Sequence, residues 1–180
     1  MPVTFLETPR FILREITHED SNAMFEMDSD PDVHRYLGNT PVKSIDEILK
    51  AIEHIRAQYI SNGIGRWAVI SRDSKNFIGW AGLKLMKEPI NGHIDHYDLG
   101  YRFLKKYWGK GIASECAAAI TDYGFNVLKQ KHLYAYTDSG NKASAKVLTK
   151  TGFEQLNSFH HEGSPCTWFW MRNPEMKLTL

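Results

Sequence analysis

A short stretch with two glycines and two lysines is the part of the sequence whose residue types are best suited to binding a ligand. It runs from Lys106 to Glu115 and reads Lys-Tyr-Trp-Gly-Lys-Gly-Ile-Ala-Ser-Glu. An extended apolar run, 98–104, precedes it, and a helical pattern begins near Ile112. A turn that leads from a strand into a helix N-terminus presents free backbone N–H groups and the positive end of the helix dipole. The pattern therefore predicts an anion site.

The two glycines allow the backbone to turn and to approach a ligand without a Cβ in the way. Lys106 and Lys110 add positive charge, so we expect a phosphate or pyrophosphate. The spacing differs from the phosphate loop G-x-x-x-x-G-K-[ST] and from the dinucleotide pattern G-x-G-x-x-G, because no third glycine follows Gly111. On this stretch alone, a plain glycine turn and an unrelated nucleotide-phosphate site remain alternatives.

Length and composition indicate one globular domain that spans residues 1–180, which is long enough for a full core. The 22 basic and 21 acidic residues nearly balance, so there is no electrostatic case for a nucleic-acid partner. No apolar run approaches membrane-spanning length, and the N-terminus lacks a signal-peptide pattern. The two cysteines form no disulfide framework, which favours a reducing, cytoplasmic setting.

The hydrophobic periodicity predicts an α/β domain with a mixed sheet. Ser44 and Glu47 form a capping box at the start of one helix, and Gly63 ends that helix. The other expected elements are strands at 11–14, 66–70, 77–85, 95–104, 132–137 and 167–171, a strand that opens at 152–153, and helices at 20–27, 112–127 and up to residue 150.

Several motifs then coincide in order and spacing over nearly the whole chain. They are Thr8 to Arg14, Asp30 to Val33, Leu99-Gly100-Tyr101, Tyr107 to Gly111, Asn141-x-x-Ser144 and Lys150-x-Gly152-Phe153. Together they resemble the GCN5-related N-acetyltransferase (GNAT) superfamily, and more narrowly its RimJ/RimL-like branch of ribosomal-protein-alanine N-acetyltransferases. The resemblance implies the GNAT fold, a mixed, mostly antiparallel sheet of six to seven strands flanked by helices in the order β-α-α-β-β-β-α-β-α-β-β.

The resemblance implies acetyl-CoA as the donor, with no metal. The pyrophosphate would lie on the glycine turn, where Lys106 stands in place of the family's usual Gln or Arg. Most of the contact would come from the backbone N–H groups of Gly109, Lys110, Gly111, Ile112 and Ala113. The pantetheine arm would pair with the backbone of Tyr101, Arg102 and Phe103, so the third and fourth strands of the core should splay apart.

Acetyl transfer to an amine needs a base, because an α-amine is largely protonated at neutral pH. We assign this role to Asp98, at the entry of the strand that would carry the oxyanion donor near Tyr101. His96, Tyr97 and a chain of water molecules remain alternatives. An exposed charge at the end of a strand is the structural alternative for Asp98.

The acid that protonates the leaving thiolate is, in much of the superfamily, a Tyr seven residues after the motif Asn. Here that position is Leu148, so the Tyr is absent. By the resemblance we assign Ser144 as the acid or as a group that positions water, and Asn141 as a polar contact to the pantetheine. A helix cap at Asn141 and an ordinary first-turn residue at Ser144 are the alternatives.

The acceptor is expected to be a cationic primary amine. A protein N-terminal α-amine is the first choice by family resemblance, with a polyamine or an aminoglycoside as alternatives. Residues 15–32 hold seven acidic residues and no Lys or Arg, which could form an acidic rim or simply a solvated face. His93-x-x-His96 lacks the Cys or carboxylate partners of a metal site. A homodimer and a non-catalytic acyl-CoA-binding module are further alternatives.

Overall fold

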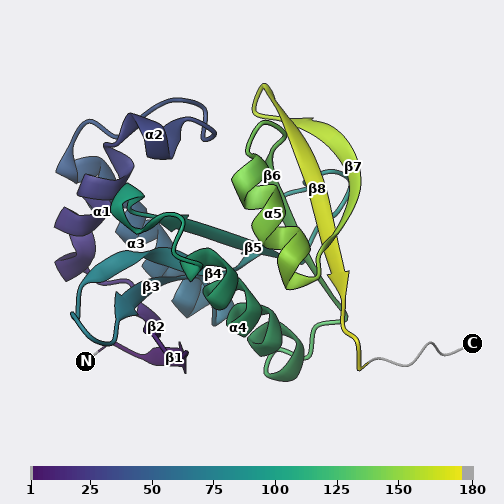
Figure 1. Cartoon of the computed structure of the whole chain (residues 1–180), viewed down its shortest axis with the longest axis horizontal. Helices are drawn as coiled ribbons and strands as arrows, with labels where there is room; N and C mark the ends of the chain where they lie inside the picture. The colour runs from purple at the N-terminus through teal and green to yellow at the C-terminus, as the bar shows by residue number, and fades with distance from the viewer. Residues whose placement is uncertain (1, 176–180) are drawn as a thin grey trace, which may run out of the picture.

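The computed structural model describes residues 2–175, and these form one mixed sheet with helices on both faces (Figure 1). The strands lie in the order β1-β2-β3-β4-β5-β6-β8-β7. Their bounds are β1 Thr4–Glu7, β2 Phe11–Glu15, β3 Arg66–Ser71, β4 Phe77–Met86, β5 His96–Phe103, β6 His132–Asp138, β7 Glu154–His161 and β8 Ser164–Arg172. The helices are α1 Ser21–Asp28, α2 Pro31–His34, α3 Ile45–Asn62, α4 Ile112–Asn126 and α5 Lys142–Thr151, with 3-10 turns η1 His18–Asp20 and η2 Lys105–Tyr107.

The predicted fold class is confirmed, with one more strand than the six to seven expected. Every strand pair is antiparallel except β5 with β6, within the described residues. The strand absent from the sequence-based order is β1, which has only four residues and pairs with β2 at the edge of the sheet. Its burial does not alternate between exposed and buried, so it carries no period-two signal.

Helix α3 shows why the sequence located some elements well. The Ser44 hydroxyl accepts the N–H of Glu47 at 3.4 Å, and the Glu47 carboxylate accepts the N–H of Lys43 at 3.2 Å. Gly63 ends the helix in the left-handed conformation, with φ of 69°. Both predicted ends are therefore confirmed, because each depends on residues within one turn of the chain.

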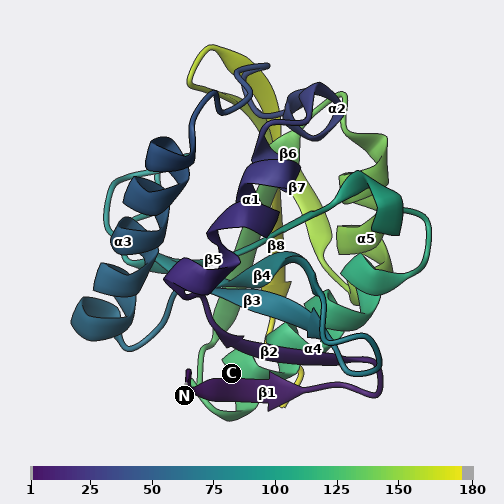
Figure 2. The same ribbon diagram turned by 90° about the vertical axis from the view of Figure 1, so that its left-hand side faces the viewer.

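The sheet separates two hydrophobic cores, and Figure 2 shows α3 and α5 on opposite sides of the strands. One core packs α4 and α5 against the sheet around Trp67, Leu83 and Phe169. The other packs α1 and α3 around Met27 and Ile52. Burial on both faces makes the sheet a rigid support for groups at its centre.

Strands β5 and β6 are parallel neighbours that separate after one register pair, Asp98 with Tyr134. On its other side, β5 stays paired with β4 along its full length, from His96 to Phe103. Figure 1 shows β6 turning away from the line of β5. The sequence-based expectation that two core strands splay apart is confirmed, and the edge of β5 beyond Asp98 faces the opening.

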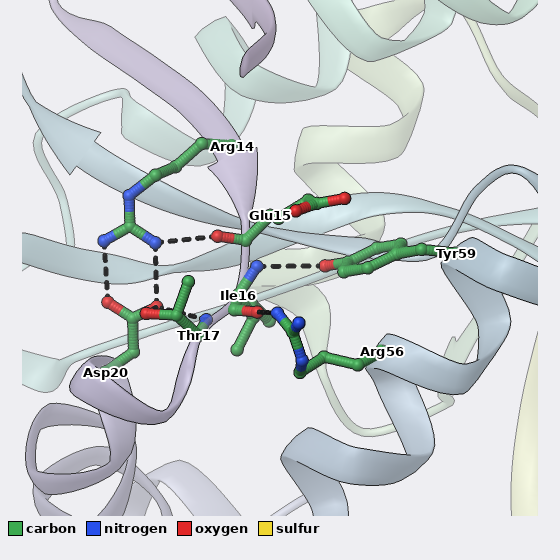
Figure 3. Close-up of polar contacts among 7 residues, drawn as sticks. All are labelled: Arg14, Glu15, Ile16, Thr17, Asp20, Arg56 and Tyr59. Carbon is green, nitrogen blue, oxygen red and sulfur yellow. Dashed lines mark hydrogen bonds and ion pairs between the residues drawn. The ribbon is translucent and has the colours of Figure 1, made fainter. Parts of the chain in front are cut away.

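A polar network ties α3 to the ends of β2 and β3 (Figure 3). The Tyr59 hydroxyl accepts the N–H of Ile16 at 3.1 Å and donates to the carbonyl of Arg66. Arg56 donates to the Ile16 carbonyl at 3.1 Å. The network fixes the first residue of β3, Arg66, whose side chain reaches the candidate site described next.

Candidate active site

The glycine turn, here residues 106–113, has the conformation that its sequence predicts. Gly109 and Gly111 have φ of 72° and 73°, a region that a side chain disfavours. Helix α4 then begins at Ile112. Within residues 2–175, the N–H groups of residues 109–113 donate to no carbonyl or side chain. They form a cluster of free donors at the N-terminus of a 15-residue helix, which is a site for an anion.

Arg10, from the turn between β1 and β2, braces the glycine turn. Its Nε lies 2.6 Å from Oε2 of Glu115, and its Nη1 donates to the carbonyl of Lys110 at 3.0 Å. Partial burial by itself would raise the pKa of Glu115. Hydrogen bonds from Thr8 and Arg10 outweigh burial, so the pKa of Glu115 is lowered. Glu115 lies in the first turn of α4, as expected from its favourable dipole interaction, and in addition holds Arg10.

The acidic segment 15–32 is partly paired with cations, while Glu19 and Glu26 stay exposed as a solvated face would. Glu26 binds Lys106 at 2.7 Å and Asp28 binds Arg102 at 2.7 Å. Asp32 binds Lys105 at 2.5 Å. The cations come from β5 and η2, some 70 to 80 residues away in sequence. They could not be paired with this segment before the fold was known. The ammonium of Lys106 contacts Glu26 of α1 and is therefore directed away from the glycine turn.

A cavity of about 510 Å³ lies where β5 and β6 separate, and we call it the split cavity. It brings together five predicted site residues, namely Asp98, Tyr101, Arg102, Asn141 and Ser144. The loop 36–40 and the β7–β8 hairpin, including His161 and Glu162, complete its wall. The remaining predicted residues lie outside this lining, on the glycine turn or, for Phe103, in the core.

Phe103 has its carbonyl occupied, because the Nε1 of Trp108 donates to it at 2.8 Å. The backbone of Tyr101 and Arg102 is on the edge of β5 that β6 has left. Of the three residues predicted to pair with an extended ligand, Phe103 therefore has a carbonyl that already accepts a hydrogen bond within the protein.

Asp98 is not an exposed strand-end charge, because only 5% of its surface is accessible. Its Oδ2 accepts from Nη2 of Arg66, while Oδ1 has no hydrogen-bond partner within the described chain. Burial raises the pKa of Asp98, and the Arg66 guanidinium opposes that rise. A carboxylate in the wall of a cavity, with a raised pKa and one buried, unpaired oxygen, is suited to accept a proton.

His96 and Tyr97, the alternative bases, do not line the split cavity. The His96 ring packs against Tyr134 and Trp168, with centroids 5.3 and 5.4 Å apart. Burial, followed by the nearby charge of His93, lowers the pKa of His96 to about 4. The structure therefore favours Asp98 among the three residues.

Ser144 lies against the hydroxyl of Tyr101, with the two oxygens 3.0 Å apart. The N–H of Ser144 donates to Oδ1 of Asn141 at 3.1 Å, so Asn141 is the N-cap of α5. Leu148, at the position where relatives carry a Tyr, is buried in the cavity wall. Burial raises the pKa of Tyr101 to about 12. A phenol is thus present beside Ser144, supplied by β5 instead of α5.

Sequence reasoning missed Arg66, Arg10 and the Tyr101 hydroxyl. Arg66 stands at the start of a strand with no motif around it, and its partner Asp98 is 32 residues away. Gly100 had entered only as part of the Leu99-Gly100-Tyr101 motif, which by itself does not indicate that an arginine passes over it. Within residues 2–175, no group of three or more His, Cys, Asp or Glu side chains is placed to hold a metal.

Comparisons with known proteins identify the family. The family described as acetyltransferase (GNAT) domain matches residues 10–154. An uncharacterized N-acetyltransferase of Bacillus subtilis, YoaA, is 33% identical over 150 residues, which cover 83% of this chain and 82% of that protein. Spermidine N(1)-acetyltransferase of Escherichia coli K12 is 27% identical over 150 residues, covering 83% and 76%.

Among solved structures, RimL, described as a ribosomal L7/L12 alpha-N-protein acetyltransferase in complex with coenzyme A, superposes with a TM-score of 0.78. It is 15% identical, with 94% of this chain and 98% of that chain covered, so the likeness is one of fold. The chain belongs to the GNAT acetyltransferase family, and it is an acetyl-CoA-dependent N-acetyltransferase. In the described part of the chain, no helix has the length and apolar character needed to cross a membrane.

Proposed function

We propose that the protein acetylates a single primary amine, and that the N-terminal α-amine of a protein or peptide is its acceptor. One observation carries the proposal. Asp98 is a buried carboxylate in the split cavity, with one oxygen held by Arg66 and one without a partner. An amine that enters the cavity thus meets a buried carboxylate that can accept its proton.

The donor half of the proposal rests on the backbone. The free N–H groups of residues 109–113 would hold the pyrophosphate of acetyl-CoA. The edge of β5 at Tyr101 and Arg102 would pair with the pantetheine arm, which places the thioester near the split. Asn141 already caps α5, so its contact to the pantetheine would come from its remaining amide N–H groups.

The chemistry that follows uses the groups of the split cavity. The neutral amine nitrogen attacks the thioester carbon, and Asp98 takes the proton that the amine must lose. The C–N bond forms and the C–S bond breaks as the tetrahedral oxyanion collapses. Ser144 gives a proton to the leaving thiolate and takes one from the Tyr101 hydroxyl at 3.0 Å, and solvent carries the proton from Asp98 back to Tyr101.

Charge balance supports a monoamine acceptor over a polyamine. Two of the acids at or near the site are paired, Asp98 with Arg66 and Asp28 with Arg102, and Asp138 and Glu162 are the other carboxylates of the cavity wall. The three carboxylates of the wall face two guanidinium groups, Arg66 and Arg102, so the wall suits one cationic charge, as an α-amine followed by peptide bonds brings, better than the three or four of a polyamine. The relatives include both acceptor types, a spermidine acetyltransferase by sequence and RimL by fold.

An acceptor panel tests the proposal. Thiol release from acetyl-CoA would be measured with a free peptide, with the same peptide blocked at its N-terminus, and with spermidine. The proposal expects turnover with the free peptide alone. Turnover with spermidine, or with the lysine of the blocked peptide, would contradict the acceptor assignment. Tight binding of CoA with no acetylation across the panel would favour the non-catalytic acyl-CoA-binding module.

The narrower assignments follow from the same proposal. The motifs and the fold likeness to RimL support the RimJ/RimL-like branch. Cys116 and Cys166 are both free and buried, which supports a reducing, cytoplasmic compartment. Light scattering of the purified protein would test the homodimer that the branch suggests.

A further inference from the structure

The Arg66 side chain crosses from β3 over β4 to reach β5. In the register of the sheet, Arg66 lies opposite Gly82, and Gly82 lies opposite Gly100. Nη1 of Arg66 donates to the carbonyl of Gly82 at 2.5 Å and to the carbonyl of Asp98 at 2.6 Å. Nη2 binds the Asp98 carboxylate. One guanidinium thus holds both the main chain and the side chain of Asp98.

Gly100 leaves the space that this crossing needs. A Cβ at Gly100 would lie 2.6 Å from Nη2 and 2.7 Å from Cζ of Arg66, closer than heavy atoms can approach. Gly82 is constrained differently, because a Cβ there would meet the carbonyl oxygen of Gly65 at 2.9 Å. The glycine that matters to the guanidinium is therefore Gly100, in the Leu-Gly-Tyr run of β5.

The Arg66–Asp98 pair is placed at the point where the sheet opens. Asp98 is the last residue of β5 in register with β6, opposite Tyr134. Other titratable groups face it from every side: Lys84 on β4, Tyr136 on β6 and His161 on β7. Only Arg66 contacts the carboxylate directly among the described side chains. Its guanidinium also lies 5.6 Å from the ring of Trp80, which restricts its movement.

We propose that Arg66 is a positioning residue for Asp98, which fixes one carboxylate oxygen and leaves the other unpaired to take the proton of the acceptor amine, with Gly100 providing its path. The inference rests on the proposed role of Asp98 as the base. It gives Arg66 a function in catalysis that acts through Asp98. The guanidinium keeps a buried carboxylate ionised within the working pH range, because an adjacent cation lowers a carboxylate pKa that burial has raised.

The test compares Arg66→Met with Arg66→Lys, and it reads the titration of Asp98 directly. Carboxyl carbons would be labelled with ¹³C, and the signal of Asp98 would be assigned by its loss in Asp98→Asn. Removal of an adjacent opposite charge raises a carboxylate pKa by about 1–3 units, so Arg66→Met should shift the titration upward by that amount. The acid limb of kcat/KM should move in the same direction. Arg66→Lys should restore the limb toward its original pH while kcat stays low, because an ammonium keeps the charge but not the planar fork.

Gly100→Ala provides a second route to the same result. The added methyl group displaces the guanidinium of Arg66, although neither Arg66 nor Asp98 is itself substituted. Its Asp98 titration should also move upward. Arg14→Met is the matched control. Arg14 pairs with Asp20 at 2.8 Å, with burial similar to that of the Arg66–Asp98 pair, but it lies outside the split cavity. It should lower stability without shifting the Asp98 titration or the acid limb.

A folded Arg66→Met whose Asp98 titration and acid limb match those of the parent protein would overturn the proposal and leave Arg66 a structural role. Should Arg66→Met fail to fold, Arg66→Lys and Gly100→Ala decide the question by the same measurements. If no amine is acetylated by any form, the proposed function fails, while the NMR titration still tests the coupling of Arg66 to Asp98.

Discussion

The glycine turn and the split cavity are built in opposite ways. The turn offers backbone N–H groups from five consecutive residues, 109–113, at the start of α4. The cavity offers side chains from β3, β5 and α5, which are far apart in sequence. A backbone site depends on conformation and tolerates most changes of side chain. A side-chain site depends on particular residues and on the contacts that hold them, so single substitutions should separate the two.

Asp98→Asn should have the largest effect. The amide cannot accept the proton, and general base catalysis contributes about 10²- to 10⁴-fold, so kcat should fall by that range. Acetyl-CoA affinity should stay within about twofold, since the donor site is made of backbone. Steady-state kinetics and calorimetric titration with CoA measure the two quantities. Turnover near that of the parent protein would assign proton removal to water.

Ser144→Ala should lower kcat by about tenfold or more, because the leaving thiolate loses its proton donor. The CoA dissociation constant should change much less. The effect should be smaller than that of Asp98→Asn, since a thiol of pKa about 8.5 leaves tolerably without help. Tyr101→Phe is the companion variant and should lower kcat in the same direction, given the 3.0 Å contact. Unchanged turnover in Ser144→Ala would remove Ser144 from the reaction.

Gly111→Val should act on the other site. A side chain in the left-handed region costs about 1–2 kcal/mol, so the turn should relax and CoA affinity should fall roughly 5- to 30-fold. At saturating acetyl-CoA, kcat should be nearly unchanged. Lys110→Ala is the side-chain control and should weaken CoA binding less. A larger loss in Lys110→Ala than in Gly111→Val would show that side chains, and not the backbone, hold the phosphate.

His96→Phe should have the smallest effect on activity and should instead change the pH dependence of stability. The folded-state pKa of His96 is about 4, below its ordinary value near 6.5, so folding favours the neutral ring. Stability is therefore fully present above about pH 6.5 and is lost as the pH falls toward 4. Between pH 7.5 and 5 the loss should be about 2 kcal/mol, and His96→Phe should remove it. Urea unfolding at both pH values measures the difference. An equal loss in the variant would assign the acid sensitivity to other groups.

The local parts of the fold and site were predictable from sequence. The caps of α3, the glycines of the turn and the helix after it each depend on residues within one or two turns of the chain. Strand β1 was not predictable, because four residues give too short a pattern. The pairing of the acidic segment was not predictable, because Lys105, Lys106 and Arg102 bind three of its seven carboxylates from about 70 to 80 residues away.

The sequence by itself determined where an anion can bind, because left-handed glycines and a helix start create free N–H groups without help from the rest of the molecule. It also supplied the carboxylate and the hydroxyl, Asp98 and Ser144. Only the tertiary structure decided that Asp98 is buried in an ion pair with Arg66 and that the Tyr101 hydroxyl forms a hydrogen bond with Ser144. Both contacts depend on strand register and on the separation of β5 from β6. Register is set by the packing of the whole sheet, and no local pattern in the chain encodes it.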